Sequence, residues 1–142
     1  MDIRLREYEE NKNDILGKLD SYTRDIVPKL DHYECDKISL VMEDEGIIVG
    51  QIVGEIRWNY LRIELFFVNQ EIRGKGIGSR LLETIERIAV QKRCNLILLE
   101  TMSFNAPNFY LNHGYEAVGR IDNHPLPNES HYFMVKHLKE SA

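Results

Sequence analysis

The chain has 142 residues, 43% of them hydrophobic and 29% charged, which suits one compact domain over residues 1–142 with a core of its own. Its net charge of -5 argues against nucleic-acid binding, which needs a basic face, and is compatible with a cationic small molecule. The sequence contains no run near the roughly 20 apolar residues that span a membrane, and no core of a signal peptide. Its two cysteines, far apart, make neither a disulfide framework nor a metal site, so we expect a cytoplasmic protein without a metal.

The N-terminal part predicts a strand, a helix and a loop. Residues 2–6 alternate between apolar and charged side chains, which is typical of a strand. Apolar residues then recur at helical spacing over 15–26, with Asn13 as a candidate cap and Pro28 as a stop. The polar segment 30–37 predicts a loop.

Three further strands are predicted over 38–42, 47–58 and 61–68. The turns between them are short, so the strands should form an antiparallel meander. Gly50 and Gly54 lie inside the second of these strands and indicate a bulge or the close approach of another group.

The apolar end of this meander leads into a glycine-rich loop over 73–78 and then into a helix that ends near Gln91. A short apolar run over 96–99 predicts a strand covered on both faces. Strand, crossover helix and strand make a parallel pair with a right-handed connection.

The C-terminal part predicts a short helix with Pro107 in its first turn and Gly114 at its end. Strands over 115–121 and 131–138 follow, separated by a loop over 122–129. The predicted fold is therefore α/β, with a seven-stranded mixed sheet flanked by helices.

The glycine loop is the first candidate site. Gly74, Gly76 and Gly78 remove every second side chain, so backbone N–H groups and the following helix N-terminus could approach a phosphate closely. Arg73 and Lys75 add positive charge. The spacing fits neither a Walker loop nor a dinucleotide-binding fingerprint. Taken alone, the pattern is equally consistent with a tight turn between a strand and a helix.

A second motif follows one helix and one strand later. Its matching residues are Ala106, Phe109, Tyr110, Gly114 and Tyr115. With the glycine loop in the expected order, it resembles the GNAT superfamily of N-acetyltransferases over roughly 38–138. The resemblance implies transfer of the acetyl group of acetyl-CoA to an amine, with the cofactor bound where the strands of the parallel pair splay apart.

The resemblance also implies which residues contact acetyl-CoA. The end of the strand before the loop would pair with the pantetheine arm, and the loop would surround the pyrophosphate. These residues are Phe66, Phe67, Val68, Arg73, Gly74, Lys75, Gly76, Ile77, Gly78 and Ser79. The family often has an asparagine at the position of Ser103, so either Ser103 or Asn105 would make that contact.

Two residues are candidates for the chemistry. In the family, the tyrosine that matches Tyr110 lies beside the cofactor sulfur, and a protonated phenol could donate to the leaving thiolate. The alternative is a core tyrosine at the edge of a short helix. Glu64 interrupts an apolar strand and, by alternation, would share a face with Phe66 and Val68. It could act as the base, often through water, or pair with a neighbouring arginine.

The acceptor is not specified by a motif. Residues 31–34 and the loop with His124 are expected to border its pocket, and His131 follows that loop. A polyamine, an aminoglycoside-like or streptothricin-like antibiotic, a protein lysine or a protein N-terminus would fit. The alternatives are a non-catalytic acyl-CoA-binding module and a nucleotide binder. The last strand or an exposed sheet edge could pair in a homodimer.

Overall fold

The structure is a computed structural model that describes residues 1–30, 35–72 and 74–138. It divides into two compact units, Met1–Glu34 and Cys35–Ala142, and the expected single domain stays a prediction. In the described ranges, no helix is both long and apolar enough to cross a membrane.

The first unit has an irregular N-terminal segment followed by one helix, α1 (Tyr8–Ile26). The strand predicted over 2–6 is wrong. Ile3 and Leu5 are fully exposed, and within the described part of this unit no second strand supplies partners for their backbone groups. A lone alternating segment therefore stays irregular.

The start of α1 also differs from the prediction, whereas its end agrees. The Glu7 carboxylate accepts hydrogen bonds from the backbone N–H groups of Glu9 and Glu10 and caps the helix. Asn13 lies inside the helix, so the predicted cap is wrong. The helix ends two residues before Pro28, as the steric demands of proline require.

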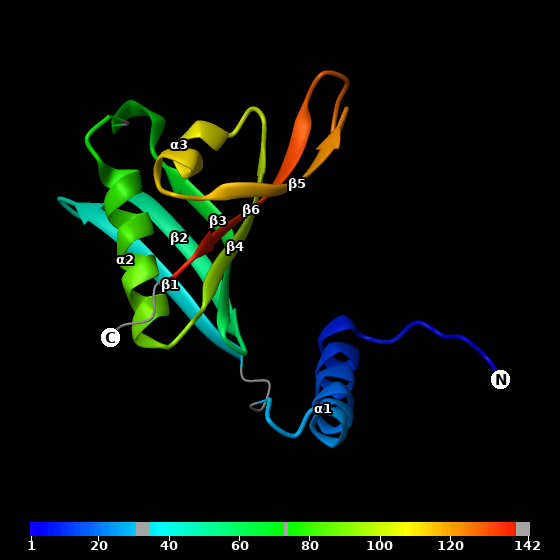
Figure 1. Cartoon of the computed structure of the whole chain (residues 1–142). Coiled ribbons are helices and arrows are strands. Elements are labelled where there is room, and N and C mark those ends of the chain that lie inside the picture. Colours follow the sequence, from blue (N-terminus) through cyan, green and yellow to red (C-terminus); the bar gives the residue numbers. More distant parts are fainter. Residues whose placement is uncertain (31–34, 73, 139–142) are drawn as a thin grey trace. The chain divides into compact units, whose positions relative to one another are not determined.

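The second unit is built on one six-stranded mixed sheet in the order β1-β2-β3-β4-β6-β5 (Figure 1). Its strands are β1 (Cys35–Asp44), β2 (Ile47–Arg57), β3 (Tyr60–Val68), β4 (Leu96–Met102), β5 (Glu116–Asp122) and β6 (Ser130–His137). Only β3 and β4 are parallel to each other; the other neighbours are antiparallel. The sheet has six strands and not the predicted seven, because residues 2–6, predicted as the first strand, form no strand.

Two details of the sheet correct the sequence prediction. β1 begins at Cys35, which pairs with Arg57, so residues 35–37 belong to the strand and not to the predicted loop. β6 pairs with both β4 and β5, which makes the last strand an interior strand. Pairing through the last strand, one of the two predicted routes to a homodimer, is therefore wrong. The sheet edges are β1 and β5, and a homodimer through an exposed edge stays a prediction.

Two helices complete the described part of the second unit. α2 (Ile77–Gln91) lies along β1, β2 and β3, and α3 (Pro107–Asn112) lies near the end of β3 where α2 begins (Figure 1). Both agree with the predicted ranges. The core joins one face of α2 to one face of the sheet, and its most buried members are Ile52, Leu61, Leu82, Ile85, Ile97 and Met134.

Candidate functional site

The glycine loop joins β3 to α2 through a short 3-10 turn (Gln70–Ile72). Gly74 and Gly76 have φ angles of 95° and 75°, in the left-handed region that favours glycine. A Cβ atom built on either residue meets no other atom within 4 Å. The two glycines therefore serve the path of the backbone and leave open space beside it. Arg73 lies outside the described residues.

The N-terminus of α2 is open to a ligand. Gly76 occupies the cap position and has no side chain to satisfy the first N–H groups of the helix. Lys75 is exposed beside it. Free N–H groups, the positive end of the helix dipole and a lysine make this end of α2 suitable for an anion.

Gly78 has a different role, because it lets α2 approach α3 and β3 closely. A Cβ atom here would lie 3.4 Å from Cζ of Phe109 and 3.5 Å from Cγ2 of Val68. One helical turn therefore joins the loop to the end of β3 and to the second motif. The sequence assigned Gly78 to ligand contact, but its close neighbours are these two side chains.

His113 forms another connection between the loop and the second motif. Its Nε2 lies 3.0 Å from the Oγ of Ser79, and its ring packs 4.7 Å from that of Phe109. His113 caps the C-terminus of α3, as its place before Gly114 indicated. The bond to Ser79 spans 34 residues, and no local pattern pointed to it.

Aromatic rings from β3 and α3 pack together near the start of α2. Tyr110 contacts Phe109 at 5.3 Å, Tyr115 at 5.8 Å and Phe66 at 6.5 Å between ring centroids. Burial raises the pKa of the Tyr110 phenol, so it keeps its proton at neutral pH. Among the described residues its hydroxyl makes no hydrogen bond. Tyr110 is therefore a protonated donor without a partner of its own.

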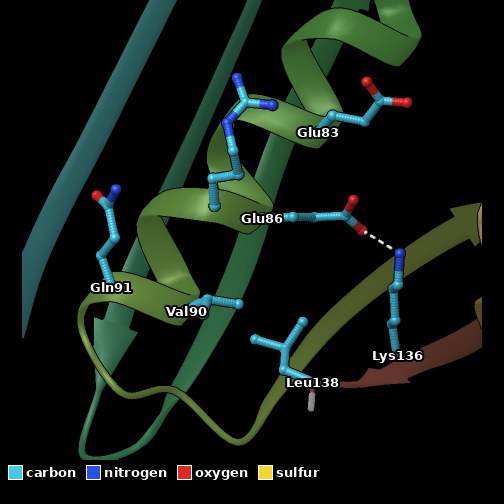
Figure 2. Close-up of a pocket in the computed structure, with 7 residues that line it drawn as sticks. Glu83, Glu86, Val90, Gln91, Lys136 and Leu138 are labelled. Atoms are coloured by element: carbon cyan, nitrogen blue, oxygen red, sulfur yellow. Dashed lines mark ion pairs between the residues drawn. The ribbon is translucent and has the colours of Figure 1, made fainter. Parts of the chain in front are cut away.

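Tyr115, by contrast, is tied to the protein. Its hydroxyl donates a 2.9 Å hydrogen bond to Glu86 of α2, and Lys136 of β6 pairs with the same carboxylate at 3.0 Å. Burial, followed by the charge of Glu86, raises the pKa of Tyr115 strongly. Figure 2 shows Glu86 pointing across a pocket toward Lys136. This pocket lies along the C-terminal half of α2, away from the glycine loop.

The two parallel strands pair over a short stretch only. The pairs run from Tyr60 with Leu96 to Arg62 with Leu98, although both strands continue in the same direction. Beyond the paired stretch, Phe66 of β3 packs against the core, whereas Phe67 is 53% exposed.

A bulge in β3 changes the position of Glu64. Val53 of β2 pairs with Leu65, but the next residue, Gly54, pairs with Ile63 and leaves Glu64 without a place in the ladder. Alternation therefore breaks here, and the prediction that Glu64 shares a face with Phe66 is wrong.

Glu64 instead lies beside the buried Glu55 of β2. Burial alone would raise the pKa of Glu55, but hydrogen bonds with Cys35, Arg57 and Glu64 lower it. Glu64 itself is exposed. Gly54 explains the bulge, because a Cβ atom there would lie 2.9 Å from the carbonyl oxygen of Arg62.

Ser103 and Asn105 differ in how far their side chains are engaged. The Ser103 hydroxyl bonds to Glu129 and accepts a 2.9 Å hydrogen bond from the backbone N–H of Ser130. Asn105 is exposed, and its backbone closes the turn after β4 by a 2.9 Å bond to the carbonyl of Met102. Ser103 therefore holds the loop before β6, which leaves Asn105 as the exposed side chain.

A chain of polar groups crosses the sheet on the face opposite α2. Arg62 of β3 pairs with Glu100 of β4 at 3.1 Å, and the other Glu100 oxygen lies 2.9 Å from Nε2 of His131. The His131 ring stacks on Phe133 at 4.7 Å and on His124 at 5.4 Å. Sequence reasoning missed Glu100, although a charged residue directly after the apolar run 96–99 was a signal for it.

Two further segments were predicted to border the acceptor pocket. Residues 31–34 are not among the described residues. The loop with His124 connects β5 to β6 and is exposed over 122–128. It brings the ring of His124 onto that of His131.

Comparison with known proteins gives consistent results. The family described as "Acetyltransferase (GNAT) family" matches residues 2–115. A blasticidin-S acetyltransferase from Streptomyces morookaense is 34% identical over 96 residues, which cover 67% of this chain and 70% of that protein.

Solved structures agree with this match. An acetyltransferase from Bacillus cereus ATCC 14579 superposes with a TM-score of 0.82 at 34% identity, covering 96% of this chain and 98% of that one. A proposed streptothricin acetyltransferase from Bacillus anthracis, in complex with acetyl coenzyme A, has a TM-score of 0.66 at 25% identity. That match covers 73% of this chain and 64% of the other.

Proposed function

The chain belongs to the acetyltransferase (GNAT) family and is an acetyl-CoA-dependent N-acetyltransferase, and we propose that it acetylates a small, cationic amine. The amine would attack the thioester directly, and Tyr110 would protonate the leaving thiolate. The observation that carries this proposal is the half-buried Tyr110, whose ring packs against Phe66 and whose hydroxyl has no hydrogen-bond partner among the described residues.

The glycine loop fits the pyrophosphate end of acetyl-CoA. Gly74 and Gly76 leave open space at their Cβ positions, and the first N–H groups of α2 have no side-chain cap. An anion at this place would accept hydrogen bonds from the backbone, with the positive charge of Lys75 nearby. Arg73 is proposed for the same contact from the sequence alone.

The acyl end fits the place where β3 and β4 continue beyond their three parallel pairs. We propose that the two strands splay there and that Phe66, Phe67 and Val68 border the pantetheine arm. Backbone groups of this part of β3 could pair with the arm as a further strand would, and a backbone N–H near Val68 could stabilise the oxyanion. Asn105, the exposed member of the pair, is proposed for the side-chain contact that the sequence assigned to Ser103 or Asn105.

The proton donor would be Tyr110. The thioester supplies an activated carbonyl whose C–S bond breaks when the amine nitrogen bonds to carbon, and the electron pair stays on sulfur. A phenol with a raised pKa remains protonated at neutral pH and can give its proton to that sulfur. Water would return a proton to Tyr110 after each turnover.

The acceptor is proposed to be cationic for two reasons. The chain carries a net charge of -5, and carboxylates from three neighbouring strands, Glu55, Glu64 and Glu100, lie on the sheet face opposite α2. The matched proteins named after blasticidin S and streptothricin suggest antibiotics as acceptors to try. A protein lysine or N-terminus remains an alternative acceptor of the same chemistry.

An acetylation assay with thiol detection tests the proposed function. The acceptors are blasticidin S, streptothricin, spermidine and a lysine-containing peptide. We expect at least one cationic small molecule to release CoA far faster than the slow hydrolysis of acetyl-CoA. Equal thiol release with and without every amine, despite tight acetyl-CoA binding, would instead indicate a non-catalytic acyl-CoA-binding module.

A further inference from the structure

The one described histidine nitrogen that is buried and has no hydrogen-bond partner is Nδ1 of His131. Burying a polar atom without a partner costs about 1–3 kcal/mol, so such an atom needs an explanation. The other ring nitrogen, Nε2, is held 2.9 Å from Glu100. His131 therefore has one ring nitrogen, Nε2, that the protein holds, and a second, Nδ1, that no described group of the protein binds.

The contact with Glu100 determines where the proton of the neutral ring lies. An ionised carboxylate can only accept, so Nε2 must carry the hydrogen and donate it. Nδ1 of the neutral ring then holds a free lone pair. Arg62 binds the second oxygen of the same carboxylate at 3.1 Å and keeps Glu100 turned toward His131. This is the arrangement of a base that is oriented by a carboxylate.

The position of His131 relates it to the proposed reaction. His131 of β6 pairs with Met102, the last residue of β4. The last parallel pair between β3 and β4 lies farther back along β4 and contains Arg62 of β3. The imidazole thus lies at the end of β4 beyond the paired stretch. The core residues Leu99 and Met134 face α2, so by alternation Glu100 and His131 face the opposite side. Phe66, whose ring packs against that of Tyr110, lies on β3 beyond the same paired stretch.

We propose that His131, and not Glu64, removes the proton from the acceptor amine through its Nδ1 atom. The proposal rests on the proposed function. Nδ1 takes one proton from the ammonium group, directly or across one water, and the neutral nitrogen forms its bond to the carbonyl carbon. The C–S bond breaks, sulfur takes a proton from Tyr110, and the nitrogen releases its second proton to water. One proton is released overall.

The surroundings of His131 are compatible with this role. The charged and titratable groups that face it are Glu100 from β4, with Arg62 behind it, and His124 from the loop before β6. Its ladder partners, Met102 and Ile121, carry no charge. Glu100 is a positioning residue, since it holds the imidazole and does not itself need to touch the acceptor.

The test measures kcat/KM against pH with each of the four amines named above. We expect His131→Gln to lower kcat/KM about 10²-fold at neutral pH. The loss should shrink as the pH approaches the pKa of the free amine, because solution then supplies the neutral form. Glu100→Gln should cause a smaller loss of the same kind. Thermal stability and acetyl-CoA affinity, measured by calorimetry, should stay close to those of the original protein.

His137→Gln is the matched control. His137 lies on the same strand and the same face, but at the opposite end of the pairing with β4, and it is mostly exposed. The His137→Gln substitution should leave kcat/KM unchanged. The proposal is overturned if His131→Gln keeps the original rate and pH profile, or if Glu64→Gln shows the pH-dependent loss expected of His131.

A second measurement does not depend on turnover. Nitrogen-15 NMR of the imidazole groups should show neutral His131 with its hydrogen on Nε2 and an unprotonated Nδ1. A hydrogen on Nδ1 would overturn the proposal, whichever acceptor is found. If none of the amines is acetylated but His131 has the expected tautomer, the proposed function fails and the geometry behind this inference is upheld.

Discussion

Tyr110 and Tyr115 are in contact, yet their hydroxyl groups have opposite surroundings. Their ring centroids lie 5.8 Å apart. The Tyr115 hydroxyl is bound by Glu86, whereas that of Tyr110 has no partner among the described residues. A hydroxyl that the protein satisfies stabilises the fold, and one that it leaves free is available to a ligand. Two neighbouring residues of one type therefore separate into a structural and a functional tyrosine.

The largest expected effect is on turnover and concerns Tyr110. Tyr110→Phe should lower kcat about 10²-fold, because the leaving thiolate loses its proton donor. The phenyl ring keeps its packing with Phe66 and Phe109, so thermal stability and acetyl-CoA affinity should change little. Steady-state kinetics and calorimetry on the same preparation measure both. Unchanged kcat would remove Tyr110 from the mechanism.

A smaller effect, on stability, is expected for Tyr115. Tyr115→Phe should lower the free energy of unfolding by about 1–3 kcal/mol, because the carboxylate of Glu86 loses a hydrogen bond. Lys136 still pairs with Glu86, which limits the loss. Denaturant titration measures it, and kcat at low temperature should stay within about twofold of the original. If kcat falls as far as in Tyr110→Phe, the two tyrosines act as one unit and the contrast between them is lost.

The smallest effect concerns alkaline pH. Burial and Glu86 raise the pKa of Tyr115 above its unfolded value of about 10. The stability contributed by this tyrosine is therefore complete below pH 10. It falls as pH rises further, because the unfolded chain loses its phenolic proton first, by at most about 1.4 kcal/mol per pH unit.

Unfolding measured between pH 9 and 11 checks this dependence. The slope above pH 10 should be shallower in Tyr115→Phe. Tyr110→Phe should also flatten it, since burial raises the pKa of Tyr110 as well. A slope that neither substitution changes would mean that other groups control alkaline unfolding.

The sequence predicted those elements whose signals are local. The ends of α2 and α3 followed from glycines, a proline and apolar spacing, and the parallel pair followed from strand, helix and strand in succession. The N-terminal strand was predicted from an equally local alternation and is wrong. A strand exists only with a partner, and the chain supplies none for residues 2–6 within the described part of that unit.

The face on which Glu64 lies could not be predicted from the local sequence, because a bulge lies at this residue. Strict alternation put Glu64 on the same face as Phe66, but the close approach of Gly54 to β3 shifts the register by one residue. A one-residue shift moves a side chain to the other face, and the sequence of β3 alone contains no sign of it.

Residue types and spacing were sufficient for the glycine loop, the short helix with Tyr110 and the family to which the chain belongs. Three pairings needed the tertiary structure: Tyr115 with Glu86, Ser79 with His113, and His131 with Glu100. The two residues of each pair lie 29, 34 and 31 residues apart in the chain, so whether they meet depends on how the helices and strands are arranged in space. The position of β6 between β4 and β5 brings His131 to Glu100, because hydrogen-bonded neighbours in a sheet can come from distant parts of the chain.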